Sequence, residues 1–479
     1  RLPLLQSYQM NLINLIVYQF LEVIMINQRV DLTLDSREFE KIYNRKKIVS
    51  MYTLGCKVNQ YETDAMIELF KDRGYEIGEF DEFSDVYVIN TCTVTAMSDK
   101  KSRQMIRRAK KINPESVMAV VGCYSQKSPD EIISIDGVNL VMGTSDRNKI
   151  VSEVEKLTGI EKVVEVIDIM KQREFEDLSL SNLKGKTRAF LKIQEGCDRF
   201  CSYCIIPYTR GPVRSRKLED IIKEVKELSE KGFSEIVLTG IHVASYGKDL
   251  NEKTSLLDVI TEIGKIENVK RIRTSSVEPL IITKEFLEGI SKVEQFCPHF
   301  HLSLQSGCDE TLKRMNRRYD TKMYKTAVDM IRNIYPDAAI TTDVIVGFPS
   351  ETEDEFNETL RFLKEVNLYD AHIFKYSPRE GTKAALMEDQ VSPKQKNERS
   401  EALINLGKEN KRAFEKRFLG EEVEVLFESH SKEGYEGHTK NYIKVWVKSK
   451  EDIQGKILKV KLTESTDEFV IGELSNINS

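Results

Sequence analysis

The sequence predicts an α/β protein built in three parts: an N-terminal parallel α/β sheet domain, a central partial (β/α)6 barrel and a small C-terminal all-β barrel. Three observations lead to this fold class. Buried-type strands alternate with amphipathic helices between Lys46 and Asp146, and six more strand–helix units follow between residues 184 and 413. After residue 414, short alternating strands continue with no long helix between them. We expect domains at 46–170, 184–413 and 414–479.

Composition excludes several classes of protein. The 479 residues are 40% hydrophobic and 31% charged, which is typical of a globular protein with a sizeable core. The net charge of −5 gives no general signature for nucleic acid, so any polyanion must bind at a local patch, and DNA is not expected. Eight cysteines are too few for a disulfide scaffold of this length. Six of them suit metal ligation, which requires a reducing compartment and predicts a cytoplasmic protein.

Residues 1–45 are expected to be an extension of doubtful status. The apolar stretch NLINLIVYQFLEVIMI is interrupted by polar residues and is too short to span a bilayer, so no membrane is expected. It lacks the basic region and cleavage site of a signal peptide. The first residue is Arg1, and we expect either a gene-start artefact or an amphipathic interaction helix, with the domain proper beginning near Lys46.

The predicted N-terminal domain carries a cysteine after each of three strands. The strands are KKIVSMYTLGC, DVYVINTC and SVMAVVGC, and their continuous apolar character favours a parallel sheet buried on both faces. Their last residues are Cys56, Cys92 and Cys123, about one βαβ unit apart. Because parallel strands bring their carboxyl ends to one edge, we expect these cysteines to be neighbours that hold a metal cluster. Three buried structural cysteines are the alternative.

The stretch EGCDRFCSYC places Cys197, Cys201 and Cys204 in a C-x3-C-x2-C pattern. Three clustered thiolates can hold three irons of a 4Fe–4S cluster and leave the fourth iron open for chemistry. Phe200 and Tyr203 can shield such a cluster from water. A closed zinc site with a distant fourth ligand is the alternative, but zinc knuckles usually pair two C-x2–4-C units.

Six strand segments predict the central barrel: 189–197, 235–240, 269–279, 299–307, 338–349 and 370–378. The C-x3-C-x2-C pattern follows the first of them, at the barrel face where such sheets keep their sites. Polar or small residues at the ends of the strands suit a nucleoside-like ligand, with hydroxyl and carboxylate groups for ribose and a glycine for close approach of a planar base. The candidates are Thr239, Gly240, Ser275, Ser276, Glu278, Gln305, Ser306, Val346 and Gly347.

Basic residues gather beside these sites and suggest a polyanionic substrate. Solvated surface faces are the alternative explanation for each run. The candidates are Lys100, Lys101, Arg103, Arg107, Arg108, Arg210, Arg214, Arg216, Arg314, Arg317 and Arg318.

Segments such as EVEVLFES, KILKVKLTES and FVIGELS predict the C-terminal barrel, which is of the OB type common in oligonucleotide-binding proteins. A stabilising appendage is the alternative. Cys297 and Cys308 lack partners at useful spacing and are expected to be structural.

Taken together, the two cysteine triads and the terminal β module resemble the radical-SAM methylthiotransferase family, over nearly the whole chain after residue 45. The resemblance implies a radical-SAM barrel, a TRAM-type tRNA-binding C-terminal domain, S-adenosylmethionine (SAM) and two 4Fe–4S clusters. In that family the open iron binds SAM, and the second cluster supplies or carries the sulfur. Catalytic residues beyond the cluster ligands are not implied.

Three strings resemble the branch that acts on N6-threonylcarbamoyladenosine beside the tRNA anticodon: TLGCKVNQYETDAM, NTCTVTAMSDKKSRQ and LKIQEGCDRFCSYCIIPYTRGPVRSR. The expected reaction inserts a methylthio group at C2 of this base at position 37. Other branches, which act on isopentenyladenosine or a ribosomal protein, remain alternatives, as does a non-catalytic iron–sulfur tRNA-binding protein. The electron donor and the sulfur source are not indicated.

Overall fold

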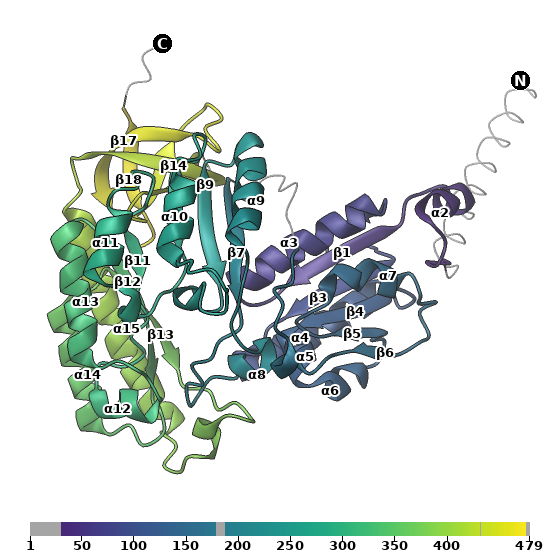
Figure 1. The fold of residues 1–479 in the computed structure, drawn as a ribbon, viewed down its shortest axis with the longest axis horizontal. Helices are drawn as coiled ribbons and strands as arrows, with labels where there is room; N and C mark the ends of the chain where they lie inside the picture. Colours follow the sequence, from purple (N-terminus) through teal and green to yellow (C-terminus); the bar gives the residue numbers. More distant parts are fainter. Residues whose placement is uncertain (1–29, 179–186, 432, 476–479) are drawn as a thin grey trace, which may run out of the picture. The chain divides into compact units, whose positions relative to one another are not determined.

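The computed structural model describes residues 30–178, 187–431 and 433–475. Backbone contacts divide the chain into two compact units. The first contains the described part of Arg1–Leu54 together with Met66–Thr91 and Lys100–Ile167. The second contains Gly55–Ala65, Cys92–Asp99 and the described part of Asp168–Ser479 (Figure 1).

The first unit contains a six-stranded parallel sheet in the order β2-β1-β3-β4-β5-β6. The strands are β1 (Ile48–Thr53), β2 (Glu76–Ile77), β3 (Val86–Thr91), β4 (Val117–Gly122), β5 (Leu140–Met142) and β6 (Val163–Glu165). The helices along this part of the chain are α2 (Ser36–Tyr43), α3 (Lys57–Asp72), α4 (Ala96–Ile112), α5 (Cys123–Lys127), α6 (Pro129–Ile133) and α7 (Ile150–Val154). The N-terminal parallel α/β sheet is therefore confirmed.

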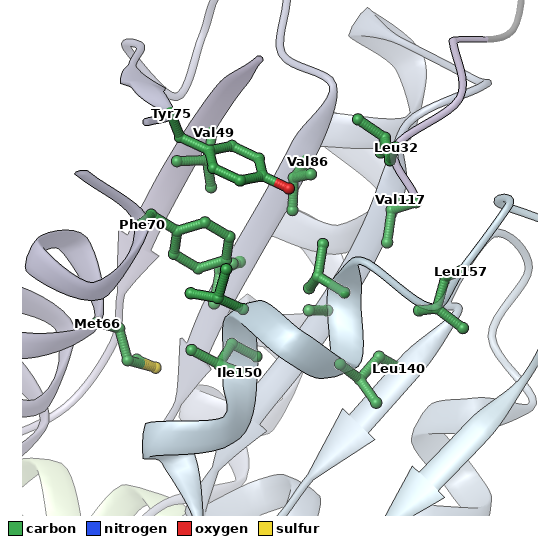
Figure 2. Packing of buried hydrophobic residues seen from close by; sticks show 14 of the residues in the cluster. Leu32, Val49, Met66, Phe70, Tyr75, Val86, Val117, Leu140, Ile150 and Leu157 are labelled. Carbon is green, nitrogen blue, oxygen red and sulfur yellow. The ribbon is translucent and has the colours of Figure 1, made fainter. Parts of the chain in front are cut away.

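Both faces of this sheet are buried, which explains the unbroken apolar runs. Val86 and Val88 pack in the cluster shown in Figure 2, whereas Tyr87 and Ile89 between them belong to a second cluster. Successive side chains of a strand point to opposite faces, so each face has its own core. A strand buried on both sides leaves few positions for polar residues, and chemistry is confined to its ends.

The folded unit begins ahead of the expected Lys46 boundary. Asp35 caps α2 by accepting hydrogen bonds from the backbone N–H groups of Arg37 and Glu38. Phe39 in this helix and Leu32 before it are buried in the core of the first unit. Residues 30–45 are therefore part of the domain rather than an appendage, while the apolar stretch at 11–26 lies outside the described residues.

The second unit contains the six predicted parallel strands. They are β7 (Arg188–Glu195), β9 (Glu235–Gly240), β10 (Arg271–Thr274), β11 (His299–His301), β12 (Ala339–Val346) and β13 (Asp370–Lys375). They form two sheets, β10-β9-β7-β8 and β11-β12-β13, where β8 (Arg214–Ser215) runs antiparallel to β7. Isolated parallel bridges join residues near β10 to residues near β11, and β13 ends its sheet. The result is a partial barrel whose two edges are the β7/β8 pair and β13.

The helices of this unit are α8 (Ile206–Arg210), α9 (Leu218–Glu230), α10 (Leu256–Gly264), α11 (Lys284–Ile290), α12 (Asp309–Arg314), α13 (Thr321–Ile334), α14 (Glu353–Val366) and α15 (Pro393–Lys416). Several begin at the capping residues that their sequences indicate. Ser255, Thr352 and Ser392 each form a capping box at the start of α10, α14 and α15. Among the described residues, no helix is both long and apolar enough to cross a membrane.

The C-terminal strands form a closed barrel in the order β14-β15-β16-β18-β17, as predicted. They are β14 (Glu422–Ser431), β15 (Gly434–Thr439), β16 (Lys444–Lys448), β17 (Ile457–Ser465) and β18 (Val470–Leu474). Arg273 in β10 donates to the carbonyl groups of Thr439 and Lys440, and its guanidinium lies over the Tyr442 ring. These contacts dock the closed barrel at the start of the parallel strands, the end opposite the C-x3-C-x2-C segment.

Candidate iron–sulfur and cofactor site

The loop that carries Cys197, Cys201 and Cys204 leaves the end of β7 through a constrained glycine. Gly196 has φ +72°, and a Cβ there would lie 1.8 Å from the carbonyl oxygen of Pro212. The backbone N–H of Cys197 donates to Gly211 at 3.0 Å, and that of Cys204 donates to Cys201 at 3.0 Å. A side chain at Gly196 would therefore force apart two backbone segments that shape the loop.

A second part of the barrel supports the same loop from the end of α12. The N–H of Ser202 donates to the carbonyl of Met315 at 3.0 Å, and its hydroxyl donates to the carbonyl of Arg314 at 2.8 Å. The side chain of Asn316 donates to the carbonyl of Phe200 at 2.9 Å. The thiols are thus presented by a loop whose backbone is bonded on both sides.

The environment of the three thiols disfavours free thiolates. Burial raises the pKa of Cys197 to about 11 and that of Cys204 to about 12, and repulsion from Cys201 adds to both shifts. Metal ligands must be deprotonated, so a positively charged iron would have to supply the missing stabilisation. The donor set therefore fits a cationic metal group better than it fits three isolated thiols.

Arg317 links this loop to the carboxylate of Glu278. Its Nη1 donates to Cys201 Sγ at 3.0 Å, and its Nη2 donates to Glu278 Oε1 at 3.1 Å. Arg199 approaches the other oxygen of Glu278 at 2.6 Å, and His242 lies 3.1 Å from it. Burial alone would raise the pKa of Glu278, but His242 and the two arginines outweigh it and lower the value to about 2. Glu278 is therefore an anion held beside the cysteine loop.

A cavity of about 230 Å³ opens next to Cys204. It is lined by Val94, Thr95, Tyr203, Cys204, Ile205, Ile206, Gln305, Asp343, Ile345, Phe374, Lys375, Tyr376 and Ser377. The mixture of apolar and aromatic walls with a few polar groups is typical of a small-molecule site. Val94 and Thr95 follow Cys92 by two and three residues, so the segment that carries Cys92 forms part of the same wall.

Four of the residues predicted to bind a nucleoside-like ligand have side chains that are available to contact such a ligand. Gln305 lines the cavity, and Glu278 lies beside the cysteine loop. The Ser275 hydroxyl is buried with no hydrogen-bond partner among the described residues, as expected for a group that meets a bound molecule, and Ser276 is exposed. An orphaned buried hydroxyl fits a bound molecule such as SAM, whose ribose carries hydroxyl groups.

Other predicted cofactor residues have different surroundings. Thr239 is buried in β9 and pairs with Lys192, while Gly240 pairs with Gln194. Ser306 is buried, and its hydroxyl lies 3.3 Å from that of Thr359, which belongs to α14.

Two further candidates lie at the end of β12. Val346 is buried, and a Cβ at Gly347 would lie 2.3 Å from the Lys396 side chain. The space beside Gly347 is therefore filled by a lysine stem rather than open to a planar base.

The second set of cysteines follows the ends of β1, β3 and β4. In the sheet, Thr53 of β1 pairs with Asn90 of β3. Thr91 of β3 pairs with Gly122 of β4, and these two residues come directly before Cys92 and Cys123 in the sequence. Cys92 and Cys123 are buried, whereas Cys56 is exposed. Although Cys56 is exposed, neighbouring groups desolvate its thiol and raise its pKa. The positive charge of Arg210 lowers this pKa but does not cancel the effect of desolvation.

Gly55 brings Cys56 close to Cys92. A Cβ at Gly55, whose φ is +112°, would lie 2.8 Å from the Cβ of Cys92 and 3.1 Å from its Sγ. Glycine is thus required both by the backbone angle and by the neighbouring cysteine.

The predicted polyanion contacts need correction in three cases. Arg210, Arg214 and Arg216 are buried within the second unit. Arg210 donates to Glu62 and Glu195, and Arg216 pairs with Glu224 and Asp177. Buried guanidinium groups that are bonded to the protein's own acceptors do not present charge to a phosphate backbone. The prediction failed because a run of basic residues does not reveal acidic partners that are remote in sequence.

The remaining basic candidates differ in exposure. Arg317 faces Cys201, and Arg314 pairs with Glu355 at 2.8 Å, so both are bonded to groups of the protein itself. Arg103 bonds Tyr124 and Glu131. The exposed side chains are Lys100, Lys101, Arg107 and Arg108 on α4, and Arg318 after α12.

Among the described residues, no three His, Cys, Asp or Glu side chains converge on the position of one metal ion. A zinc site gathers its ligands around a single ion. A cubane cluster differs because each thiolate binds a different iron, which spaces the sulfur atoms more widely. Three cysteines on one bonded loop remain suitable for such a cluster.

Several residues of this site were missed by sequence reasoning. Arg199 and Asp343 were not singled out, and Arg317 was assigned to the polyanion. Phe374 and Tyr376 line the cavity at the end of β13, and the rule that polar and aromatic groups matter at strand ends would have indicated them.

Comparison with protein families agrees with both halves of this arrangement. Residues 191–363 match the Radical SAM superfamily, and residues 48–143 match the uncharacterized protein family UPF0004. The first match covers the cysteine loop and most of the partial barrel, and the second covers β1 to β5 with Cys56, Cys92 and Cys123.

Curated relatives match nearly the whole chain. Threonylcarbamoyladenosine tRNA methylthiotransferase MtaB of Bacillus subtilis (strain 168) is 45% identical over 87% of this chain and 94% of its own length. The protein of the same name from Aquifex aeolicus is 41% identical over 79% of this chain and 92% of its own. A tRNA-2-methylthio-N(6)-dimethylallyladenosine synthase from Thermoanaerobacter pseudethanolicus is 38% identical over 89% and 92%.

Among solved structures, the radical S-adenosylmethionine methyltransferase TsrM from Kitasatospora setae has a TM-score of 0.51. It covers 70% of this chain and 77% of its own at 14% identity, which supports the fold alone. The relatives, the two family matches and the cysteine loop at the strand end lead to one assignment. The chain belongs to the radical-SAM methylthiotransferase family, whose radical-SAM part implies SAM and a 4Fe–4S cluster.

Proposed function

We propose that this protein inserts a methylthio group at C2 of N6-threonylcarbamoyladenosine at position 37 of tRNA, giving 2-methylthio-N6-threonylcarbamoyladenosine. The observation that carries the proposal is the cavity beside Cys204, whose wall includes the segment directly after Cys92. The cysteine loop of the barrel and the segment that follows Cys92 thus border one space of suitable size for a base.

Cys197, Cys201 and Cys204 would hold the first cluster, and Ser275, Glu278 and Gln305 would contact SAM. When bound together, the cluster and SAM supply an electron and a carbon radical that removes hydrogen from an unreactive C–H bond. The protein itself positions the bound groups and protects them from water. Arg317 holds the Cys201 sulfur and Glu278 in fixed relation.

The largely apolar walls of the cavity limit the contact of water with the reacting groups. Tyr203, Ile345 and Tyr376 present ring and aliphatic carbon to this space. A carbon radical abstracts hydrogen from many partners, so a cavity with few polar groups limits side reactions.

Cys56, Cys92 and Cys123 would hold a second 4Fe–4S cluster. The support is the register of the sheet, in which Thr91 and Gly122 are opposed directly before Cys92 and Cys123. Cys56 joins them because the Gly55 backbone lies against Cys92. The second cluster would supply or carry the sulfur.

The substrate assignment rests on relatives whose names specify threonylcarbamoyladenosine in tRNA. We assign the anticodon loop as the region bound, and the closed C-terminal barrel and the exposed basic residues of α4 as its contacts. We place the protein in the cytoplasm because its thiolate ligands require a reducing compartment.

The test uses protein reconstituted with iron and sulfide under anaerobic conditions, with SAM, a reductant and tRNA that carries threonylcarbamoyladenosine. Nucleoside mass spectrometry should detect the methylthio derivative together with 5′-deoxyadenosine. tRNA that lacks the threonylcarbamoyl group is the control and should give no methylthio product. A product on isopentenyladenosine instead, or binding of tRNA without turnover, would overturn the substrate assignment or the activity, respectively.

A further inference from the structure

Buried charges connect the barrel to the segment that carries Cys56. Arg210 donates to Glu62 at 2.5 Å, to Glu195 at 2.6 Å and to Asn59 at 2.7 Å. Lys192 donates to Glu195 at 2.7 Å and to Glu62 at 3.3 Å. All five side chains are buried, and the four ionised ones carry two positive and two negative charges.

This network joins the segment that carries Cys56 to the end of the strand that leads into the Cys197 loop. Asn59 and Glu62 lie in Gly55–Ala65, and the Cys56 thiol donates to Asn59 Oδ1 at 3.5 Å. Glu195 ends β7 two residues before Cys197. Arg210 therefore bonds, with one guanidinium group, residues that flank a cysteine of each triad.

A second buried arginine holds the segment that carries Cys92. Arg379 Nη2 donates to Asp99 Oδ2 at 2.7 Å and to Thr93 Oγ1 at 2.5 Å. The Thr93 hydroxyl donates in turn to Asp99 at 2.9 Å. Arg379 is only 4% exposed, so solvent does not weaken this ion pair as it does a surface pair.

The two arginines come from opposite edges of the partial barrel. Arg210 follows the cysteine loop after β7, and Arg379 follows β13, the last strand of the other sheet. Both are in the same compact unit as the segments they hold. The segments Gly55–Ala65 and Cys92–Asp99 are thus fastened to the two edges at which the barrel is not closed by strands.

We propose that Arg210 and Arg379 are positioning residues that fasten these two segments as a side wall of the partial barrel and so set the position of Cys56 and Cys92 relative to the radical-generating loop. The positioning role rests on the proposed function, because it matters only when both triads hold clusters. Misplacement of reacting groups by about 1 Å can cost about 10²-fold in rate, so rigid fastening is needed for sulfur transfer.

The experiment compares Arg379→Met with Arg399→Met in the fully reconstituted enzyme. Arg399 is a matched control because it is 3% exposed and pairs with buried Glu351 at 2.7 Å, yet contacts neither cysteine-bearing segment. Three quantities are measured: iron per chain, the ratio of 5′-deoxyadenosine to methylthio product, and the magnetic interaction between the two reduced clusters by electron paramagnetic resonance.

In Arg379→Met we expect both clusters to remain and SAM cleavage to continue, while the ratio of 5′-deoxyadenosine to methylthio product rises about tenfold or more. The magnetic interaction between the clusters should cover a broader range of strengths, because the Cys92 segment is no longer held in one position. Arg399→Met should leave the ratio and the interaction as in the wild type. Arg379→Lys keeps one charged bond to Asp99 and should restore most of the coupling.

Arg210 is tested through Arg210→Lys, because removal of its charge would leave two buried carboxylates with Lys192 alone and could prevent folding. This variant should also raise the ratio. A ratio and an inter-cluster interaction equal to the wild type in both Arg379→Met and Arg210→Lys would overturn the positioning role. Loss of one cluster in Arg379→Lys would also overturn it, because the residue would then be needed for cluster binding rather than for positioning.

Different measurements on the wild-type enzyme test the proposed function and the positioning role. Wild-type enzyme that makes no methylthio product from threonylcarbamoyladenosine tRNA contradicts the proposed substrate, whereas the inter-cluster interaction can still be compared between variants. Wild-type enzyme with only about four irons contradicts the second cluster itself.

Discussion

The two cysteine triads differ in how the fold positions their members. Cys197, Cys201 and Cys204 lie within eight residues on one loop whose backbone is bonded to Gly211 and Met315. Cys56, Cys92 and Cys123 are separated by whole βαβ units and depend on the register of three strands. A local triad needs only a shaped loop, while a dispersed triad needs a folded sheet. Loss of tertiary structure should therefore affect the second triad first.

The largest effect that separates the two triads should come from removing one ligand of each. Cys201→Ala should halve the iron from about eight to about four per chain and abolish 5′-deoxyadenosine formation. Cys92→Ala should also halve the iron, but SAM cleavage should continue without methylthio product. Iron analysis and chromatography of the nucleosides test both. Loss of SAM cleavage in Cys92→Ala would show that the triads do not act separately.

Two strained glycines test how each triad is shaped. Gly196→Ala would place a Cβ 1.8 Å from the Pro212 carbonyl oxygen at φ +72° and should disrupt the first cluster. Gly122→Ala would place one 2.7 Å from the Thr91 carbonyl oxygen at φ +98° and should disrupt the second. Each should cost about 1–3 kcal/mol from backbone strain alone, and the collision adds to this.

Gly232→Ala is the control for these glycines, since φ is +92° and no atom lies within 4 Å of the added Cβ. It should cost about 1–2 kcal/mol in thermal unfolding and leave the iron content unchanged. Equal iron loss in all three variants would mean that general destabilisation, and not the shape of each site, decides cluster retention.

A smaller effect is expected at the hydrogen bond from Arg317 to Cys201. Arg317→Met removes a donor to one ligand sulfur and should lower SAM cleavage about 10–100-fold, with the reduction potential of the first cluster shifted downward. Redox titration followed by electron paramagnetic resonance measures that potential. Arg314→Met is the neighbouring control, because the Arg314 side chain pairs with Glu355 rather than with a cysteine of either triad. A second-cluster signal that also moved would contradict a local effect.

The smallest effect is expected for the cysteines outside both triads. Cys297 and Cys308 are buried, and Cys297→Ala should cost about 1 kcal/mol by leaving a small cavity. The iron content and the rate of SAM cleavage should not change. A fall in iron in this variant would instead assign Cys297 to a cluster.

Most of the fold could be predicted because it depends on patterns that are local in the sequence. Each of the six barrel strands is a short segment followed by polar or small residues, and the alternation of strands and helices leaves few topologies. The start of the first domain was less clear. Leu32 and Phe39 are single core residues in a polar stretch, and their burial depends on a sheet formed further along the chain.

The site was predictable only where spacing carries the information. The C-x3-C-x2-C pattern is complete within one segment, whereas Arg210 meets a carboxylate 148 residues away and Arg379 meets one 280 residues away. No periodicity reports such pairs, so a buried arginine and a surface arginine look alike in sequence. Gly347 was misleading for the same reason, since the side chain that fills its open side is Lys396.

The attachment of the C-terminal barrel has a consequence for the size of the substrate. β7 begins at Arg188, which bonds Tyr442 of that barrel at 3.3 Å, and ends at Glu195, two residues before the first cysteine of the loop. At about 3.3 Å per residue the strand spans about 23 Å. The strand fixes the distance between the closed barrel and the cysteine loop. If the closed barrel holds tRNA as we propose, the bound molecule must be long and bent enough to reach the cysteine loop as well. A free nucleoside is too short to reach both places, so under this proposal the enzyme should distinguish polymers from their monomers by length before any base is recognised.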